Sequence, residues 1–350
     1  MHLIALVSSY FKKQLIKAQL ILGFLFLFYS CSVRYDSYTI SGNTMGTTYL
    51  IKLVFNDNNL DKRKIEGSID SILFNLNQQM STWIKGSEIS LFNKDISLQP
   101  QKISDDFFHV LEQGQLIYQK SEGLFDYTIF PVMDLWGFGP LVNKEKKIPN
   151  GDEIKEVLEY VGADKIQLNY PYVKKLHPKL QLDLNAIAKG YAVDKIYDWL
   201  SDKGFSNIFV EIGGEIKCGG INKSNNPWLV GIDTPLADSL PGKKIASKTI
   251  LKNEALATSG NYRNFRIENN RVVNHTFNPT SGEPIETNVL SVSVKSDKCL
   301  IADAWATALM VLSYEDGMEK VKSNESIEAL WIVLEDDNVL KQYNSRGFYY

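Results

Sequence analysis

The chain has 350 residues, of which 44% are hydrophobic and 23% are charged. This composition excludes collagen-like, disulfide-rich and intrinsically disordered proteins, and it supplies enough apolar residues for a large core. The formal net charge is −3, and an acidic chain of this kind argues against non-specific binding to nucleic acid, so we expect no nucleic-acid partner.

The N-terminus has the pattern of an export signal. Lys12, Lys13 and Lys17 precede the apolar run AQLILGFLFLFY, which is short for a membrane span but suits a signal peptide. The run is followed by Ser30 and Cys31, which resemble a bacterial lipoprotein cleavage site with Cys31 as the lipidated residue. The two residues before Ser30 are bulky for such a site, so an uncleaved anchor and ordinary secretion stay open.

The rest of the chain predicts an α+β fold. We expect a signal peptide at 1–30, a tether at 31–37 and one compact domain at 38–350 with mixed or antiparallel sheets and packed helices. Alternating or apolar runs predict strands at 38–55, 165–168, 172–176, 181–184, 206–210, 228–233, 248–252, 289–294 and 327–334. Helical periodicity predicts helices at 60–80, 105–122, 152–161, 185–203 and 302–312, and Leu116 is among the residues of the second helix that are expected in the core.

Two early segments are candidates for ligand contact. Within 38–55, the interruption SGNTMGT is rich in Gly and Thr, so its backbone N–H groups could approach a ligand near Met45. Trp83 follows the helix at 60–80, where it could stack on a ring or cover the core. The stretch 123–140 is rich in Gly, Pro and aromatic residues and is expected to be a structured loop lining a site.

The segment QLDLNAIAKGYAVDKIY at 181–197 is the strongest single candidate. A short buried strand is expected to lead into a helix whose N-cap is Asn185. The free N–H groups of a helix start favour an anion such as phosphate. Lys189 adds a positive charge where a helix prefers a negative one, which indicates a ligand; the alternative is an ordinary surface lysine.

Asp303 and Thr307 lie four residues apart in the helix predicted at 302–312. They therefore share one face, and their oxygens are of the kind that Mg²⁺ prefers. The alternative is a helix cap together with a buried threonine that bonds its own turn.

The sequence lacks the motifs of several common enzyme classes. It contains no GxSxG, P-loop, HExxH or CxxC motif, and its four histidines do not suggest a zinc site. His275 lies in a polar loop and could be catalytic or simply exposed. Cys218 and Cys299 could pair, although small buried thiols are the simpler interpretation.

The chain after Tyr38 resembles the flavin transferase (ApbE) family over nearly its whole length. The motifs that carry the resemblance occur in the family's order: TMGT at 44–47, MSTW at 80–83, LFDYTIFPVMDLWGFGP at 124–140, LDLNAIAKGYAVD at 182–194, VEIGGE at 210–215, HTFNPTSGEP at 275–284 and ADAWATALMVL at 302–312. Each motif alone is weak, but the ordered set is specific.

The resemblance implies FAD as substrate and Mg²⁺ as cofactor. It implies transfer of FMN from FAD to a Ser or Thr hydroxyl of a partner flavoprotein, such as a redox-pump subunit, with release of AMP. It implies Mg²⁺ ligands at Asp303, Thr307 and the carbonyl of Ala186. His275 is the candidate for taking the hydroxyl proton or for positioning the acceptor. FAD contacts are implied at Met45, Trp83, Leu124, Phe125, Asp126, Asp183, Lys189 and Phe277.

The sequence departs from the family pattern at several positions. Trp83 stands where tyrosine is frequent, Leu124 where alanine is common, and Ala306 where some members have an aspartate that would add a carboxylate to the metal site. Two other functions stay open, a Mg²⁺-dependent FAD pyrophosphatase and a flavin-binding lipoprotein without catalysis. We expect export to the periplasmic side and a lipid anchor, with the inner membrane favoured.

Overall fold

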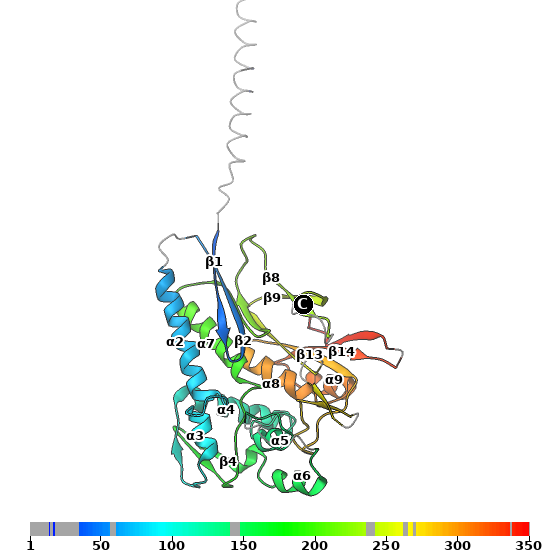
Figure 1. The fold of residues 1–350 in the computed structure, drawn as a ribbon. Coiled ribbons are helices and arrows are strands. Elements are labelled where there is room, and N and C mark those ends of the chain that lie inside the picture. Colours follow the sequence, from blue (N-terminus) through cyan, green and yellow to red (C-terminus); the bar gives the residue numbers. More distant parts are fainter. Residues whose placement is uncertain are drawn as a thin grey trace, which may run out of the picture.

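One large antiparallel sheet organises the molecule (Figure 1). The computed structural model describes Gln14, Lys17 and residues 35–56, 61–140, 148–235, 242–261, 265–268, 271–336 and 338–349. In this part of the chain the sheet has eight strands, in the order β1-β2-β6-β7-β10-β13-β14-β15. They are β1 (Asp36–Thr44), β2 (Thr47–Phe55), β6 (Asn207–Ile212), β7 (Glu215–Gly219), β10 (Glu254–Gly260), β13 (Val289–Ser296), β14 (Glu328–Leu334) and β15 (Leu340–Asn344).

The two faces of the sheet are covered differently. Helices pack on one face: α2 (Lys62–Met80), α7 (Ala188–Asp202), α8 (Cys299–Leu309) and α9 (Tyr314–Lys322). The other face carries a second buried cluster and the ribbon of β8 (Trp228–Asp233) and β9 (Ile245–Leu251). Successive side chains of strand β7 point to opposite faces of the sheet. Ile216 and Cys218 join this second cluster, whereas Lys217 on the other face reaches Asp194 of α7.

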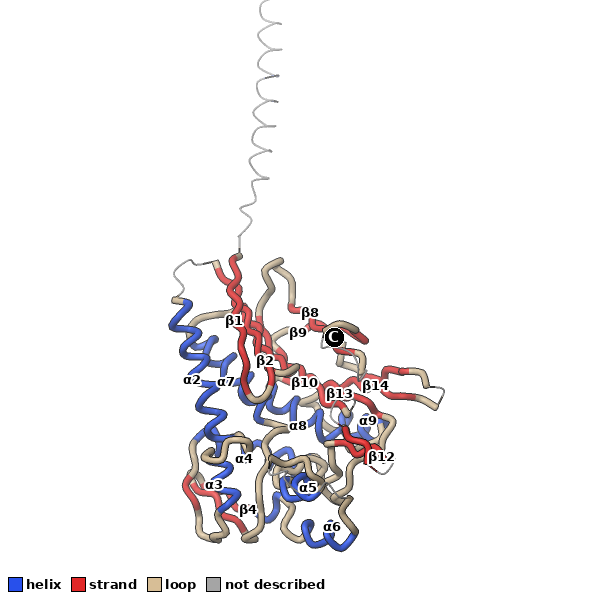
Figure 2. Tube along the Cα trace, viewed as in Figure 1, coloured by secondary structure: helices blue, strands red, loops and turns tan. Residues whose placement is uncertain are grey.

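Smaller elements gather beyond one end of these helices (Figure 2). They are α3 (Glu88–Lys94), α4 (Asp105–Lys120), α5 (Phe130–Leu135), α6 (Gly151–Leu158), the 3₁₀ turn Ala163–Lys165, and a small sheet of β3 (Gln101–Lys102), β5 (Tyr172–Lys175) and β4 (Ile166–Asn169). A hairpin of β11 (Phe265–Glu268) and β12 (Arg271–Asn274) follows β10. A third apolar cluster joins α5 and α6 to Val273 and Phe277.

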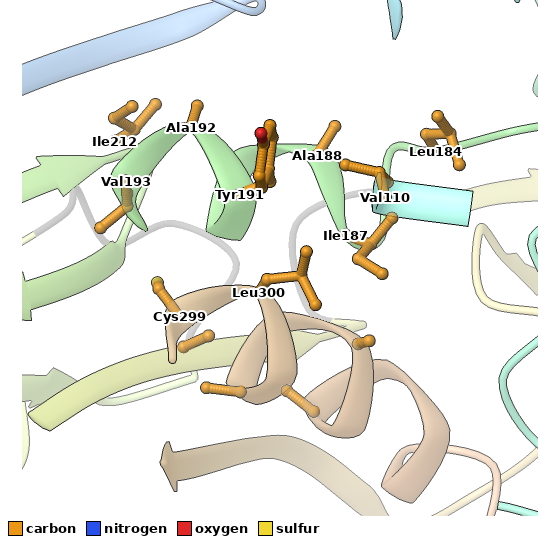
Figure 3. Close-up of a cluster of buried hydrophobic side chains, with 14 of the residues drawn as sticks. Val110, Leu184, Ile187, Ala188, Tyr191, Ala192, Val193, Ile212, Cys299 and Leu300 are labelled. Atoms are coloured by element: carbon orange, nitrogen blue, oxygen red, sulfur yellow. The ribbon is translucent and has the colours of Figure 1, made fainter. Parts of the chain in front are cut away.

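Helices α7 and α8 pack against each other within the main apolar cluster. Figure 3 shows Cys299 and Leu300 at the start of α8 beside α7. Ile187, directly before α7, and Val193 within it belong to the same cluster. These four side chains are almost fully buried. This packing places the first turns of both helices next to one another, and both carry residues predicted to bind ligand.

The α+β prediction is confirmed, and most predicted elements are present within a few residues of the expected bounds. The hairpin within 38–55 turns at Met45 and Gly46, whose φ angles of 49° and 73° are left-handed. Strand β14 is buried along its length, as its apolar sequence predicts. Cys218 and Cys299 are free, buried thiols.

Three local predictions are wrong. Residues 181–184 form no strand, because the backbone of Leu182 bonds to the Asn93 side chain rather than to a neighbouring strand. Helix α7 begins at Ala188, so Asn185 is not its N-cap and bonds to Asp183 instead. Leu116 in α4 was expected in the core but is 47% exposed. In addition, the expected loop at 123–140 contains the short helix α5.

Apart from Gln14 and Lys17, the export signal lies outside the described residues, as do Cys31 and most of the tether. Within the described part of the chain, no helix combines the length and apolar character needed to cross a membrane.

Candidate active site

A pocket of about 780 Å³ opens where the α7–α8 pair meets α5 and the loop after β12. Its size falls in the usual range for small-molecule sites, roughly 300–1,000 Å³. Its walls include eleven of the predicted site residues: Trp83, Leu124, Phe125, Asp126, Asp183, Ala186, Lys189, His275, Phe277, Asp303 and Thr307. The structure thus brings together residues spread over more than two hundred positions of sequence.

Met45 lines a second pocket of about 390 Å³ beside the β1–β2 turn. Trp83, Asn185 and Lys189 belong to the walls of both pockets, so the two cavities adjoin there. Trp83 is 65% exposed, which excludes the role of a core residue and leaves its ring available to a ligand. A long ligand with a ring at each end would suit such a pair of adjoining cavities.

Lys189 lies between two buried carboxylates. Its Nζ is 2.8 Å from Oε1 of Glu215 and 3.9 Å from Oδ1 of Asp303. Burial opposes the charge of Lys189, but the Asp303 and Glu215 carboxylates outweigh it and raise the pKa of the ammonium. Burial also raises the pKa of Glu215 to about 7 and raises that of Asp303, against the attraction of Lys189. Lys189 is therefore a largely buried ammonium paired with carboxylates and not an ordinary surface lysine.

The close approach of α7 and α8 sets the position of Asp303. Its Oδ2 accepts a hydrogen bond of 2.9 Å from the backbone N–H of Gly190. A Cβ on Gly190 would stand 2.5 Å from the Cys299 carbonyl oxygen and 2.8 Å from the Asp303 Cβ, so only glycine fits. One turn further along α7, Asp194 accepts from the N–H groups of Cys299 and Leu300 at the start of α8.

Two further carboxylates are buried in the wall of the larger pocket. Asp183 accepts from the backbone N and the Nδ2 of Asn185 at 2.8 and 2.9 Å. Asp126 accepts from the backbone N and the hydroxyl of Thr128 at 2.8 and 2.7 Å. Burial raises the pKa of each carboxyl to about 6 even though these hydrogen bonds favour the charged form.

Polar groups from the β12 loop complete the wall. His275 is half-buried and precedes Thr276, whose hydroxyl donates to Oδ1 of Asn261 at 2.7 Å. Phe277 packs against Trp136 and Phe138 with ring centroids 6.1 and 5.6 Å apart. The imidazole of His275 and the ring of Phe277 thus lie on the same pocket wall, one polar and one apolar.

The oxygen donors of the pocket suit a hard cation. Oδ1 of Asp303 faces Lys189 at 3.9 Å, a distance beyond a hydrogen bond, and the Thr307 hydroxyl lies 3.1 Å from that of Ser259. Ala186 lines the same pocket. No cluster of three or more His, Cys, Asp or Glu suited to a metal occurs among the described residues. The carboxylate of Asp303 and the hydroxyl of Thr307 are donors that fit Mg²⁺, which usually takes one or two carboxylates and completes its shell with water and phosphate oxygens.

A comparison with protein families identifies the chain. The family model described as "ApbE family" matches residues 45–331. The chain belongs to the ApbE family. This match spans both pockets and every predicted ligand residue, from Met45 to Thr307.

Similar ApbE proteins cover almost the whole chain. An FAD:protein FMN transferase of Vibrio cholerae is 36% identical over 93% of this chain and 96% of its own length. An FAD:protein FMN transferase of Haemophilus influenzae is 34% identical over 91% of this chain and 92% of its own length. The solved "Flavin Transferase ApbE from Vibrio cholerae" superposes with a TM-score of 0.81 at 35% identity, covering 90% of this chain and 98% of that one. The apo form of the Pseudomonas stutzeri flavinyl transferase ApbE superposes with a TM-score of 0.81 at 32% identity, covering 90% of this chain and 96% of that one.

Glu215 lines this ApbE site although it is not among the site residues predicted from the sequence. Its side chain is 5% exposed, and its Oε2 has no hydrogen-bond partner among the described residues. The available signal was an acidic residue directly after two glycines within VEIGGE. Periodicity along one strand does not reveal that Lys189 lies opposite, since the two residues belong to different elements.

Proposed function

We propose that this chain transfers FMN from FAD to a serine or threonine hydroxyl of an acceptor flavoprotein and releases AMP. The observation that carries the proposal is the placement of Lys189 beside Asp303 at the junction of two adjoining pockets. A dinucleotide has two rings joined by a diphosphate, and this arrangement offers two cavities with a cation between them. The relatives named FAD:protein FMN transferase support the same activity.

Mg²⁺ is proposed as the cofactor, with ligands from Asp303, Thr307 and the carbonyl of Ala186. When bound, it would neutralise charge on the phosphoryl oxygens of FAD during transfer. The net charge of the wall supports this role, because Lys189 balances only one of the two carboxylates beside it.

The chain's own groups would position the reactants and move one proton. The acceptor oxygen forms a bond to the phosphorus of the FMN half, and the bond from that phosphorus to the bridging oxygen breaks, so that AMP departs with the bridging oxygen. His275 is the proposed acceptor of the hydroxyl proton. Lys189 faces the diphosphate, and Trp83 offers an exposed ring for stacking.

The location of the reaction is also a proposal. The positive and apolar pattern of residues 1–30 supports export, and Cys31 is the proposed lipid anchor at the periplasmic side of the inner membrane. An exported transferase would require acceptors that expose a Ser or Thr segment on the same side of the membrane.

The test uses the full chain in detergent with FAD, Mg²⁺ and a candidate acceptor such as a redox-pump subunit. We expect AMP release that depends on the acceptor and a mass gain on the acceptor equal to FMN. Asp303→Ala should reduce AMP release by at least 100-fold, about the effect of losing one transition-state charge contact. Asp202→Ala, at the exposed end of α7, is the matched control and should leave the rate unchanged.

Equal AMP release without acceptor would identify a pyrophosphatase instead. Binding of FAD with no AMP in either case would leave a flavin-binding protein, and Mg²⁺-dependent turnover in Asp303→Ala would contradict the metal ligand.

A further inference from the structure

Glu215 and Asp303 compete for one ammonium group. Lys189 Nζ lies 2.8 Å from Glu215 and 3.9 Å from Asp303, so it is hydrogen-bonded to the former and only attracted by the latter. Both carboxylates are about 95% buried, which strengthens each attraction because water does not screen it. Without Glu215, the nearest carboxylate for the ammonium would be Asp303.

An ammonium on Asp303 would exclude a metal ion from that carboxylate. A lysine ammonium and a divalent cation would both seek Oδ1 of Asp303, since Oδ2 already accepts from Gly190. We propose that Glu215 is a positioning residue that holds Lys189 away from Asp303 and thereby keeps this carboxylate available to a divalent cation. The inference rests on the metal site of the proposed function and adds a residue that is not one of its ligands.

The backbone conformation sets the direction of the Glu215 side chain toward Lys189. Glu215 is the first residue of β7 and pairs with Ile212 across a turn at Gly213 and Gly214, whose φ angles are 64° and 103°. A side chain at the first position of a paired strand has a set direction, here toward α7. Because Oε2 has no hydrogen-bond partner in the described part of the chain, Lys189 is the group that orients this carboxylate.

The charges of the group agree with the inference. With Glu215 and Asp303 ionised and Lys189 protonated, the group carries one net negative charge and attracts a cation. A divalent cation on Asp303 would change this to one net positive charge, which suits a diphosphate. Glu215 therefore lets Lys189 and the metal remain in the site together, each with its own carboxylate.

The test measures binding of Mn²⁺ alone to the full chain in detergent, by the electron paramagnetic resonance signal of the free ion. Glu215→Gln should weaken Mn²⁺ about 10-fold, because a neutral amide releases Lys189 to Asp303. Lys189→Met should bind Mn²⁺ more tightly than wild type. Adding Glu215→Gln to Lys189→Met removes only the direct attraction of the Glu215 charge, so it should weaken Mn²⁺ binding clearly less than Glu215→Gln does in the presence of Lys189. The matched control is Glu254→Gln, which removes a partner of Lys295 at 3.2 Å outside the pocket and should leave the affinity unchanged.

A second measurement does not depend on the stability of the Lys189 variant. In a metal-free crystal structure of Glu215→Gln, the Lys189 Nζ to Asp303 Oδ1 distance should fall from 3.9 Å to about 2.8 Å. An unchanged distance would overturn the proposal, as would equal Mn²⁺ affinity in wild type and Glu215→Gln. A loss of the same size with and without Lys189 would make Glu215 a direct ligand and overturn it too. Wild type that binds no Mn²⁺ would overturn the metal site of the proposed function and this inference with it.

Discussion

The carboxyl group of Asp183 is buried in the wall of the larger pocket. It is 6% exposed, and burial raises its pKa from 3.8 to about 6 although Asn185 donates two hydrogen bonds to it. Between these two pH values the folded protein binds more protons at this site than the unfolded chain. The free energy of unfolding therefore falls as the pH rises from about 4 through 6, and the loss persists above that range.

Asp183→Asn removes this dependence. The side-chain amide of Asn185 can rotate to present its oxygen, so the hydrogen bonds have a route to re-form. The free energy of unfolding of the variant minus that of wild type should be smallest near pH 4 and should grow by up to about 3 kcal/mol by pH 8. Urea unfolding of both proteins at pH 4, 6 and 8 measures this difference in the free energy of unfolding, with Asp202→Asn as the exposed control. A difference that does not change with pH would refute the assigned ionisation.

At the scale of elements, the site depends on how closely α7 approaches α8. Gly190→Ala would place a Cβ 2.5 Å from the Cys299 carbonyl oxygen, so the helices must separate and the bond from the Gly190 N–H to Asp303 must lengthen. We expect a loss of roughly 1–3 kcal/mol in the free energy of unfolding, as for other overpacked core sites. Affinity for Mn²⁺ should fall in the same variant.

Gly67→Ala provides the matched control for this helix change. Gly67 lies within α2 and has open space where a Cβ would stand, so alanine should raise the free energy of unfolding by about 0.5–1 kcal/mol. Urea unfolding of both variants gives the comparison. If Gly190→Ala were as stable as wild type and bound Mn²⁺ equally, the close packing of α7 on α8 would not be what places Asp303.

The sequence predicted these elements better than the contacts between them. The spacing of Asp303 and Thr307 placed both on one helix face, and the structure confirms that they share a pocket wall. The pairing of Lys189 with Glu215 was missed because it joins a helix to a strand that is distant in the sequence. The strand expected around Leu182 is absent because a side chain, Asn93, replaces the neighbouring strand, and hydrophobic periodicity cannot distinguish the two.

At the scale of the whole molecule, the larger pocket joins two apolar clusters. The main core contributes α7 and α8, whereas Phe277 belongs to the cluster around α5 and α6. The Trp136 Nε1 donates to the Gly282 carbonyl oxygen at 2.9 Å, which fixes α5 against the loop that carries Phe277. A ligand in this pocket would therefore contact both clusters at once and should stabilise them as one cooperative unit.

Calorimetry with FAD tests this expectation. Without a divalent cation, so that FAD stays intact under the proposed mechanism, FAD at 100 times its Kd should raise the free energy of unfolding by about 2.7 kcal/mol. Each further tenfold excess should add about 1.4 kcal/mol. The described body should melt in a single transition that moves as a whole, because the ligand is lost when either cluster unfolds. Two transitions, of which FAD moves only one, would mean that the α5–α6 cluster unfolds independently and that the pocket belongs to the main core alone.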